Sequence, residues 1–188
     1  MSDLIQPQPK IHKESFVHPS AELWGAVEIE EYVLVAPHVS IRADEGTPFK
    51  ICQGTNIQDG VIMHGLYGKF VTVDSLDYSI YVGSHCSIAH GALVHGPSRI
   101  DKKTFIGFKA IVHSAKIGRN CYVGHGAQVL GVELPDNTYV PNGWIIDRQE
   151  QIEELKRLTM PDEAKEFNKE VVDRNKELVK RHKSQIMP

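Results

Sequence analysis

The feature that most constrains the fold of this chain is an aliphatic residue that recurs every six positions. The series starts at Val17, is interrupted by a short insertion after Ile41 and a longer one after Met63, resumes at Val82 and runs to Val140 with one-residue deletions before Ile117 and Leu134. A small or β-branched residue follows most of these positions four residues later. A strict six-residue period fits neither an amphipathic helix nor a hairpin meander.

A six-residue unit predicts a short strand and a turn, and three such units close one triangular coil. The aliphatic side chains then point into the prism and stack on their counterparts in the next coil, about 4.8 Å away. We therefore expect an all-β fold, with an N-terminal extension at 1–16 and a parallel β-helix of five to six coils at 17–146. The spacing does not determine the hand of winding.

Residues 147–188 have helical patterns and should pack on the β-helix. Asp147 and Glu150 are typical of a capping box that opens a short helix ending near Leu158, and Pro161 opens a longer helix. The apolar stripe predicted for the longer helix comprises Ala164, Phe167, Val171, Asn175, Leu178 and His182. This stripe predicts packing along a face of the prism, in its own chain or in a neighbour.

The bulk composition excludes several partners. The net charge is −3, and apart from a basic end at 180–183 the Lys and Arg residues are dispersed, which does not favour binding to nucleic acid or to an anionic membrane. No apolar run is long enough for a membrane span or a signal peptide, so we expect a soluble, cytoplasmic protein. Cys52, Cys86 and Cys121 are odd in number and lack CxxC spacing, so we interpret them as packed thiols.

The repeat contains three histidines that could bind a metal ion: His64, His90 and His95. If each insertion replaces one turn, four residues form a ladder on one side of the prism: Arg42, His64, His95 and His113. Two imidazoles one coil apart can converge on one ion. His90 belongs to a different side and reaches that pair only in a neighbouring chain, an arrangement that closes under threefold symmetry.

Three imidazoles leave one tetrahedral position open, which is typical of a catalytic zinc site where the pKa of bound water falls to about 7. Zn²⁺ is the expected ion, and Fe²⁺ or Co²⁺ would suit the same donors. Taken singly, each histidine could be an ordinary surface residue. The register of His64 and His95 favours the metal interpretation, whereas the role of His113 stays open.

Four segments in order resemble the signatures of the gamma-class carbonic anhydrases, including the carbonic-anhydrase-like domain of the carboxysome scaffold protein. They are Ser40-Ile-Arg-Ala-Asp-Glu-Gly, Thr55-Asn-Ile-Gln-Asp-Gly-Val-Ile-Met-His, Ser87-Ile-Ala-His and Val94-His-Gly-Pro. The likeness covers roughly residues 15–180. It implies a left-handed β-helix, a homotrimer, and reversible hydration of CO2 to bicarbonate by a metal-bound hydroxide.

The resemblance also implies residue roles. It makes His64, His90 and His95 the metal ligands, with His90 supplied by the adjacent subunit. Arg42 and Asp44 match a salt bridge between subunits, although an ordinary surface pair is an alternative. The remaining matches are Glu45, the carboxylate beside the metal-bound water; Gln58 and Asn56, which hydrogen-bond around the site or merely cap turns; and Asn175, which the C-terminal helix brings to the pocket.

One departure from the family concerns proton transfer. Tyr67 stands where some members carry a proton-shuttling glutamate, and a tyrosine with a pKa near 10 is a poor relay at neutral pH. Buffer or Glu45 would then carry the proton. Two alternatives to the enzyme stay open: a non-catalytic scaffold or bicarbonate-binding protein, and a coenzyme A-dependent acyltransferase or thioesterase, which would leave the three histidines unexplained.

Overall fold

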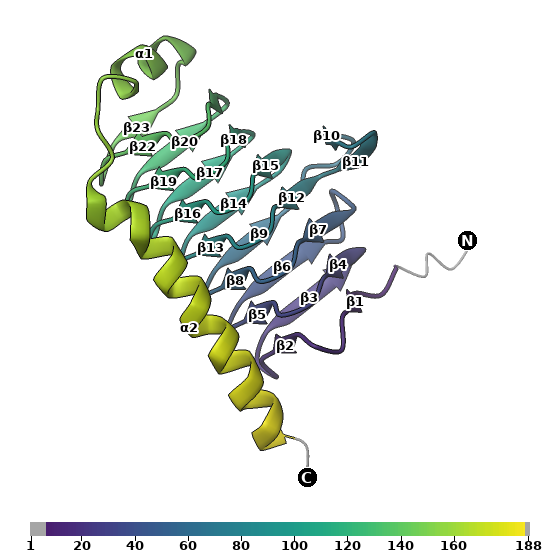
Figure 1. Cartoon of the computed structure of the whole chain (residues 1–188). Coiled ribbons are helices and arrows are strands. Elements are labelled where there is room, and N and C mark those ends of the chain that lie inside the picture. The colour runs from purple at the N-terminus through teal and green to yellow at the C-terminus, as the bar shows by residue number, and fades with distance from the viewer. Residues whose placement is uncertain (1–6, 187–188) are drawn as a thin grey trace.

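A computed structural model describes residues 7–186 as a triangular prism of three parallel sheets with one long helix along a face (Figure 1). Each coil passes through sheet A, then sheet B, then sheet C, and each sheet has seven strands. The coils wind left-handed, so the predicted fold class is confirmed.

The strands are short and stack in register from coil to coil. Sheet A contains β1 (Lys10–Ile11), β4 (Val27–Ile29), β7 (Phe49–Ile51), β12 (Ile80–Val82), β15 (Ser98–Ile100), β18 (Lys116–Ile117) and β21 (Glu133–Leu134). Sheet B contains β2 (Phe16–Val17), β5 (Leu34–Val35), β8 (Asn56–Ile57), β13 (Ser87–Ile88), β16 (Phe105–Ile106), β19 (Tyr122–Val123) and β22 (Tyr139–Val140). Sheet C contains β3 (Glu22–Gly25), β6 (Ser40–Ala43), β9 (Ile62–His64), β14 (Leu93–His95), β17 (Ile111–His113), β20 (Gln128–Leu130) and β23 (Ile145–Ile146).

The aliphatic positions of the repeat form the core, as predicted. Ile57, Ile88 and Ile106 stack in three successive coils of sheet B, and each is fully buried. Burying one such side chain contributes about 1.5–3 kcal/mol relative to leaving it exposed. A column of them along every sheet makes the prism one continuous hydrophobic core.

The β-helix begins earlier and is longer than predicted. β1 already pairs with β4, ahead of the predicted start at residue 17, and the seven strands of each sheet replace the expected five to six coils. Ile11 stands six residues before Val17 and pairs with the buried Ile29, so it extends the repeat one position beyond the predicted start. It is exposed because an end coil has a neighbour on one side only.

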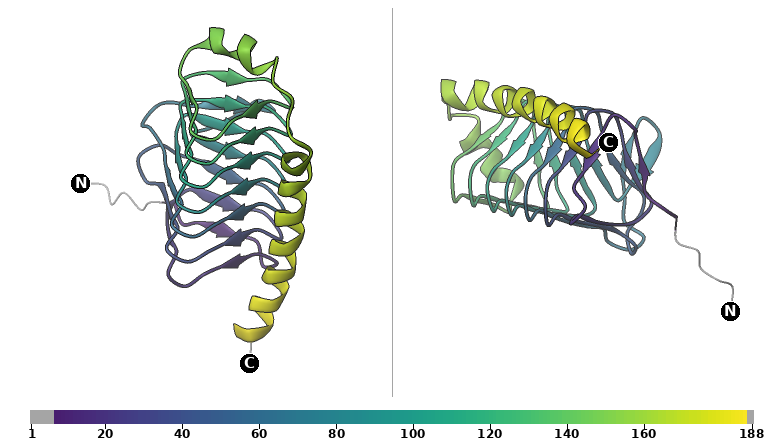
Figure 2. Two further views of the ribbon diagram at one scale, coloured as in Figure 1. Left: turned by 90° about the vertical axis from the view of Figure 1, so that its left-hand side faces the viewer. Right: turned by 90° about the horizontal axis from the view of Figure 1, so that it is seen from below.

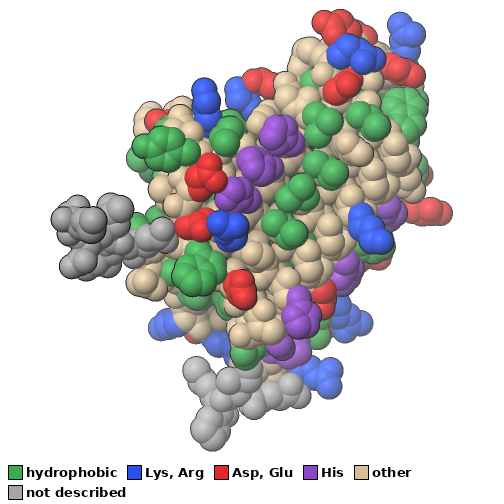
Figure 3. All heavy atoms as spheres, turned by 180° about the vertical axis from the view of Figure 1, so that it is seen from behind, with side chains coloured by type: hydrophobic (Ala, Val, Ile, Leu, Met, Phe, Trp, Pro, Cys, Tyr) green, Lys and Arg blue, Asp and Glu red, His purple; other side chains and the backbone are tan. Residues whose placement is uncertain are grey.

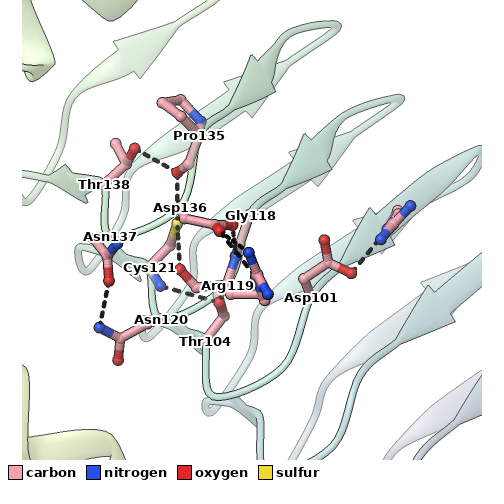
Figure 4. A network of polar contacts seen from close by, with 11 residues as sticks. Asp101, Thr104, Gly118, Arg119, Asn120, Cys121, Pro135, Asp136, Asn137 and Thr138 are labelled. Atoms are coloured by element: carbon pink, nitrogen blue, oxygen red, sulfur yellow. Dashed lines mark hydrogen bonds and ion pairs between the residues drawn. The ribbon is translucent and has the colours of Figure 1, made fainter.

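The corner between sheets A and B is stabilised by side-chain hydrogen bonds from coil to coil (Figure 4). Thr104 Oγ1 donates to the Gly118 carbonyl at 2.8 Å, and the Arg119 guanidinium lies 2.6 Å from Asp136 Oδ2 in the following coil. These contacts give hydrogen-bond partners to polar groups in the turns that the pairing between strands does not reach. Corners of this kind keep successive coils in register.

The longer insertion folds outward as a hairpin of β10 (Val71–Val73) and β11 (Leu76–Tyr78). It occupies one corner of the prism between β9 and β12, so the coils before and after it remain adjacent. The short link 44–48 between β6 and β7 lies at the same corner, between sheets C and A.

A 3-10 turn at Gln149–Gln151 and the short helix α1 (Ile152–Leu155) end the β-helix. The capping box lies one residue later than predicted, at Arg148 and Gln151, because a 3-10 turn precedes the helix. The side chain of Gln151, not that of Glu150, accepts hydrogen bonds from the amides of Asp147 and Arg148, at 3.0 and 2.9 Å. Helix α1 also ends before Leu158.

Helix α2 (Asp162–Ile186) begins where Pro161 predicts and lies along sheet B of its own chain (Figure 2), where it contacts β2, β5 and β13. The predicted stripe is wrong in part: the buried residues are Asn168, Val172 and Val179, and the predicted positions lie beside them, half-buried. The buried residues each follow a predicted position by one residue, and Asn168 is buried where its amide donates to the His85 carbonyl at 3.0 Å. Neither helix of the described part of the chain has the length and apolar character of a membrane span.

Candidate metal centre

A ladder of histidines crosses the outer face of sheet C. Strand pairing places Arg42, His64, His95 and His113 side by side in four successive coils, which confirms the predicted register. The ring centroids of His64 and His95 lie 5.3 Å apart, and those of His95 and His113 lie 5.1 Å apart. Figure 3 shows this row of histidine side chains with acidic and basic side chains beside it.

His64 and His95 direct ring nitrogens at one point. Nδ1 of His64 lies 3.4 Å from Nε2 of His95, and Nδ1 of His95 lies 3.0 Å from the Gly96 carbonyl oxygen. The carbonyl accepts the Nδ1–H and leaves Nε2 of His95 with its lone pair free. Metal–nitrogen distances of 2.0–2.1 Å in a tetrahedral site place two ligand nitrogens about 3.3–3.4 Å apart, so the pair fits one such ion.

Glu45 lies on the other side of the His64 ring. Its Oε2 atom is 3.4 Å from Nε2 of His64, a buried nitrogen with no hydrogen-bond partner. That distance brings a carboxylate within reach of the ring without a well-formed hydrogen bond. The contact has the arrangement of a carboxylate that orients a ligating imidazole.

Two glycines allow this approach. A Cβ atom on Gly46 would lie 2.3 Å from the Leu66 amide nitrogen, and one on Gly65 would lie 2.2 Å from the Gly46 carbonyl oxygen. The link that carries Glu45 therefore packs directly on the backbone that follows His64 only because both residues lack a side chain. This is the physical reason for the Glu-Gly and His-Gly pairs in the motifs.

Arg42 and Asp44 form an ion pair within the chain. The guanidinium NH2 lies 2.9 Å from Asp44 Oδ2, and this hydrogen bond lowers the pKa of the Asp44 carboxyl. The other oxygen of Asp44 is buried without a partner. The salt bridge that the resemblance places between subunits thus exists here inside one subunit, and a role at an interface stays a prediction.

His90 lies at the opposite edge of sheet C from the His64–His95 pair. It occupies the turn between β13 and β14, whereas His95 ends β14 and His64 ends β9. Within residues 7–186 no group of three or more His, Cys, Asp or Glu side chains is arranged to hold a metal. One chain therefore presents two nitrogens at one corner of the prism and His90 at another.

Gln58 and Asn56 lie on the His90 side. Gln58 is in the turn before β9, and its Nε2 donates to Asn56 Oδ1 at 2.9 Å. Asn56 is fully buried and donates to Ser87 Oγ at 2.8 Å. These amides do not surround the His64–His95 pair of their own chain, so in the predicted trimer they would accompany His90.

Asn175 and Tyr67 are not placed at the pair either. Asn175 Nδ2 donates to the Val171 carbonyl of its own helix at 2.8 Å, on the face of the prism formed by sheet B. Tyr67 lies in the loop before β10 with 79% of its surface exposed. A part for Asn175 in a shared pocket remains a prediction, and the role of Tyr67 stays open.

The residue that the motif analysis overlooked is Asp59. Its Oδ2 lies 3.1 Å from Nδ1 of His90. The signal was present in the spacing, because Asp59 precedes His90 by the same 31 residues that separate His64 from His95. The one-coil offset that predicts the histidine pair therefore also places this carboxylate under His90.

Comparison with known proteins first defines the class. The chain matches the solved structure of a hexapeptide transferase family protein from Anaplasma phagocytophilum with a TM-score of 0.72, over 92% of this chain and 91% of that one. Because the two sequences are only 16% identical, this likeness concerns the fold alone. The protein is a left-handed β-helix of hexapeptide repeats.

No protein-family model matches the chain. It is 44% identical over 149 residues to the carboxysome assembly protein CcmM of a Nostoc species, which is 79% of this chain and 27% of that protein. It is 34% identical over 161 residues to a carbonic anhydrase of Methanosarcina thermophila, which is 80% of this chain and 65% of that enzyme. The chain thus spans less than two thirds of each of these relatives. Both similarities support its assignment to the gamma-class carbonic anhydrase family.

Proposed function

We propose that this protein is a carbonic anhydrase that interconverts CO2 and bicarbonate at a metal site shared between the subunits of a homotrimer. The observation that carries the proposal is the 3.4 Å separation of a His64 nitrogen from a His95 nitrogen, with His90 at the opposite edge of the same sheet. Similarity to the Methanosarcina carbonic anhydrase supports it.

The donor set fits a divalent ion. His64 and His95 supply two imidazole nitrogens, and His90 of a neighbouring copy would supply the third in a cyclic assembly. Zn²⁺ suits three imidazoles with one open position, and Fe²⁺ or Co²⁺ suit the same donors. When bound, such an ion supplies Lewis acidity and lowers the pKa of water to about 7, so that a nucleophile exists at neutral pH.

The protein side chains then divide the remaining tasks. Glu45, which lies beside the far nitrogen of the His64 ring, would orient that ring, and its proposed catalytic task is to accept the proton released from the attacking water or to orient that water. Gln58 would arrive with His90 and hydrogen-bond an oxygen of CO2 or bicarbonate, held in place by Asn56. Arg42 and Asp44 fix the start of the link that carries Glu45.

A second candidate function is a carbonic-anhydrase-like scaffold or bicarbonate-binding protein without catalysis. It is favoured by one observation: three relatives at 37–44% identity are carboxysome assembly proteins, and the chain spans 22–30% of their lengths. This candidate keeps the metal site and lacks hydration activity, so it is separated from the enzyme by rate measurements.

The test combines metal content with stopped-flow CO2 hydration on anaerobically purified protein. We expect about one metal per chain in the native protein and loss of metal and activity in His90→Ala. The control is His113→Ala, which removes the exposed end of the same ladder and should retain both. Stoichiometric metal with hydration at the buffer rate would favour the scaffold, and absence of metal would contradict the three-histidine site.

Subunit mixing tests the sharing directly. Trimers of His64→Ala alone and of His90→Ala alone have no intact site. A cyclic trimer that contains both variants has one intact site, so refolding an equal mixture should restore about one quarter of native activity. A site built within one chain would give no recovery.

A further inference from the structure

Four side chains form a column at the corner between sheets B and C. Asp59, His90, Phe108 and His125 occupy the same turn position in successive coils, because the amides of Gly91, Lys109 and Gly126 donate in turn to the carbonyls of Asp59, His90 and Phe108. These hydrogen bonds are 2.9, 3.0 and 2.8 Å long. The column therefore has the spacing of the coils themselves.

His90 is held from both sides within this column. Below it, Asp59 Oδ2 lies 3.1 Å from its Nδ1 atom. Above it, the Phe108 ring lies 5.5 Å away, tilted by 50°. Phe108 is itself stacked on His125 at 4.3 Å and 14°, and its amide donates to His125 Nδ1 at 3.0 Å. The His90 ring is thus held in one orientation on a corner that is otherwise exposed.

The contact with Asp59 selects the free nitrogen of His90. A carboxylate accepts the Nδ1–H, so Nε2 keeps its lone pair. His95 has the same arrangement, with its Nδ1 directed at the Gly96 carbonyl oxygen and its Nε2 free. Both rings have the form in which histidine ligates a metal, although they lie at opposite edges of sheet C.

We infer that Asp59 is a positioning residue for the shared metal site: it orients His90 and sets its tautomer before the neighbouring subunit docks. The inference rests on the proposed function. The two side chains are 53% and 55% exposed, and an exposed ion pair of this kind stabilises a fold little. Its structural consequence is therefore the direction in which Nε2 of His90 points.

The test compares zinc affinity of the full-length native protein, Asp59→Asn and Asp59→Ala by competition with a chromogenic chelator. We expect about 10- to 100-fold weaker binding in Asp59→Ala with the oligomer intact by light scattering. Asp59→Asn should fall between, because its amide oxygen still accepts the Nδ1–H without a charge. ¹⁵N NMR of the histidines in metal-free protein should show His90 protonated at Nδ1 in the native chain and a mixed tautomer in Asp59→Ala.

Asp136→Ala is the matched control. Asp136 is also a turn carboxylate that pairs with a basic group one coil away, Arg119, but at the corner between sheets A and B (Figure 4). It should leave zinc affinity and the His90 tautomer unchanged. If native protein binds zinc and Asp59→Ala binds it equally well, or if Asp59→Ala only loses its oligomeric state, the inference is overturned and the proposed function stands. If the native protein binds no zinc, both fall.

Discussion

His64 and His95 are 31 residues apart in the chain, yet their nearest ring nitrogens are 3.4 Å apart. The intervening segment includes the hairpin β10–β11, which projects from one corner and leaves the coils on either side in direct contact. The same offset pairs Asn56 with Ser87 and Asp59 with His90. One coil-to-coil register therefore builds both halves of the proposed shared site.

Truncating an inward residue of a strand should cost much more stability than truncating its outward neighbour. Met63 is fully buried in the prism, and Met63→Ala should cost about 2–5 kcal/mol of unfolding free energy because it leaves a cavity between coils. Its neighbour Ile62 is 48% exposed on the face of sheet C, and Ile62→Ala should change the stability of the isolated chain by less than about 0.5 kcal/mol. Urea unfolding measures both. Equal losses would contradict the assignment of the faces.

The cysteines should be inert in the folded protein. Burial raises the pKa of both Cys86 and Cys121 to about 12, and burial also raises the pKa of Cys52. At pH 8 a thiol with a pKa of 12 is ionised to about one part in ten thousand, so a disulfide reagent should react only after denaturant is added. Absorbance of the released thiolate measures this. Rapid labelling of the native chain would show that the corners open.

An ion-pair cluster on sheet A should make stability depend on pH. Burial opposes ionisation of Glu30, yet hydrogen bonds from Lys50 and from the Gln53 amide outweigh it and lower the pKa of Glu30. A lowered pKa contributes stability above the unfolded value of about 4.3 that disappears as pH falls through the folded value. Glu30→Gln should therefore destabilise by at most about 1 kcal/mol at pH 7, since the carboxylate is 35% exposed, and by progressively less as the pH falls below about 4.3.

Lys50 should set the alkaline limit of the same cluster. Burial lowers its pKa, but hydrogen bonds to Glu28 and Glu30 exceed that effect and raise it to about 12. Its contribution is complete below the unfolded value of about 10.4 and is lost as pH rises through 12. Urea midpoints of Lys50→Met and native protein should thus converge at high pH. Glu133→Gln, at an exposed pair with Lys116, is the control and should show no such convergence.

Substitutions of two asparagines in α2 should affect different properties, one the stability of the fold and the other catalysis. Asn168→Ala removes a buried hydrogen bond to the His85 carbonyl and should cost about 1 kcal/mol of unfolding free energy. Asn175 only bonds its own helix, so Asn175→Ala should be nearly neutral for unfolding. Under the proposed function it should instead lower kcat/KM for CO2. A stable Asn175→Ala protein with native kinetics would remove this residue from the pocket.

Prediction from the sequence pattern was less accurate for the C-terminal helices than for the β-helix. The start of α2 follows from Pro161 and was predicted correctly. The buried ridge was not: it lies one position further along, at Asn168, Val172 and Val179, where the helix meets the prism and Asn168 bonds the His85 turn. The capping residue was placed one position early because a 3-10 turn intervenes before α1. The first difference depends on contacts between segments distant in sequence, which local periodicity does not contain, whereas the second depends on local hydrogen bonds to the Gln151 side chain.

The sequence by itself determined the β-helix, because a strict hexad period assigns the inward and outward side chains locally. It predicted the ladder of Arg42, His64, His95 and His113 on the condition that each insertion replaces one turn, which the strand pairing meets. Tertiary structure alone decided that the long insertion leaves the prism as a hairpin, that Glu45 approaches His64 through two glycines, and that Asp59 holds His90. These relationships depend on how coils stack and how links pack at the corners. Stacking brings together residues that share no local pattern, so only the folded chain brings them within contact distance.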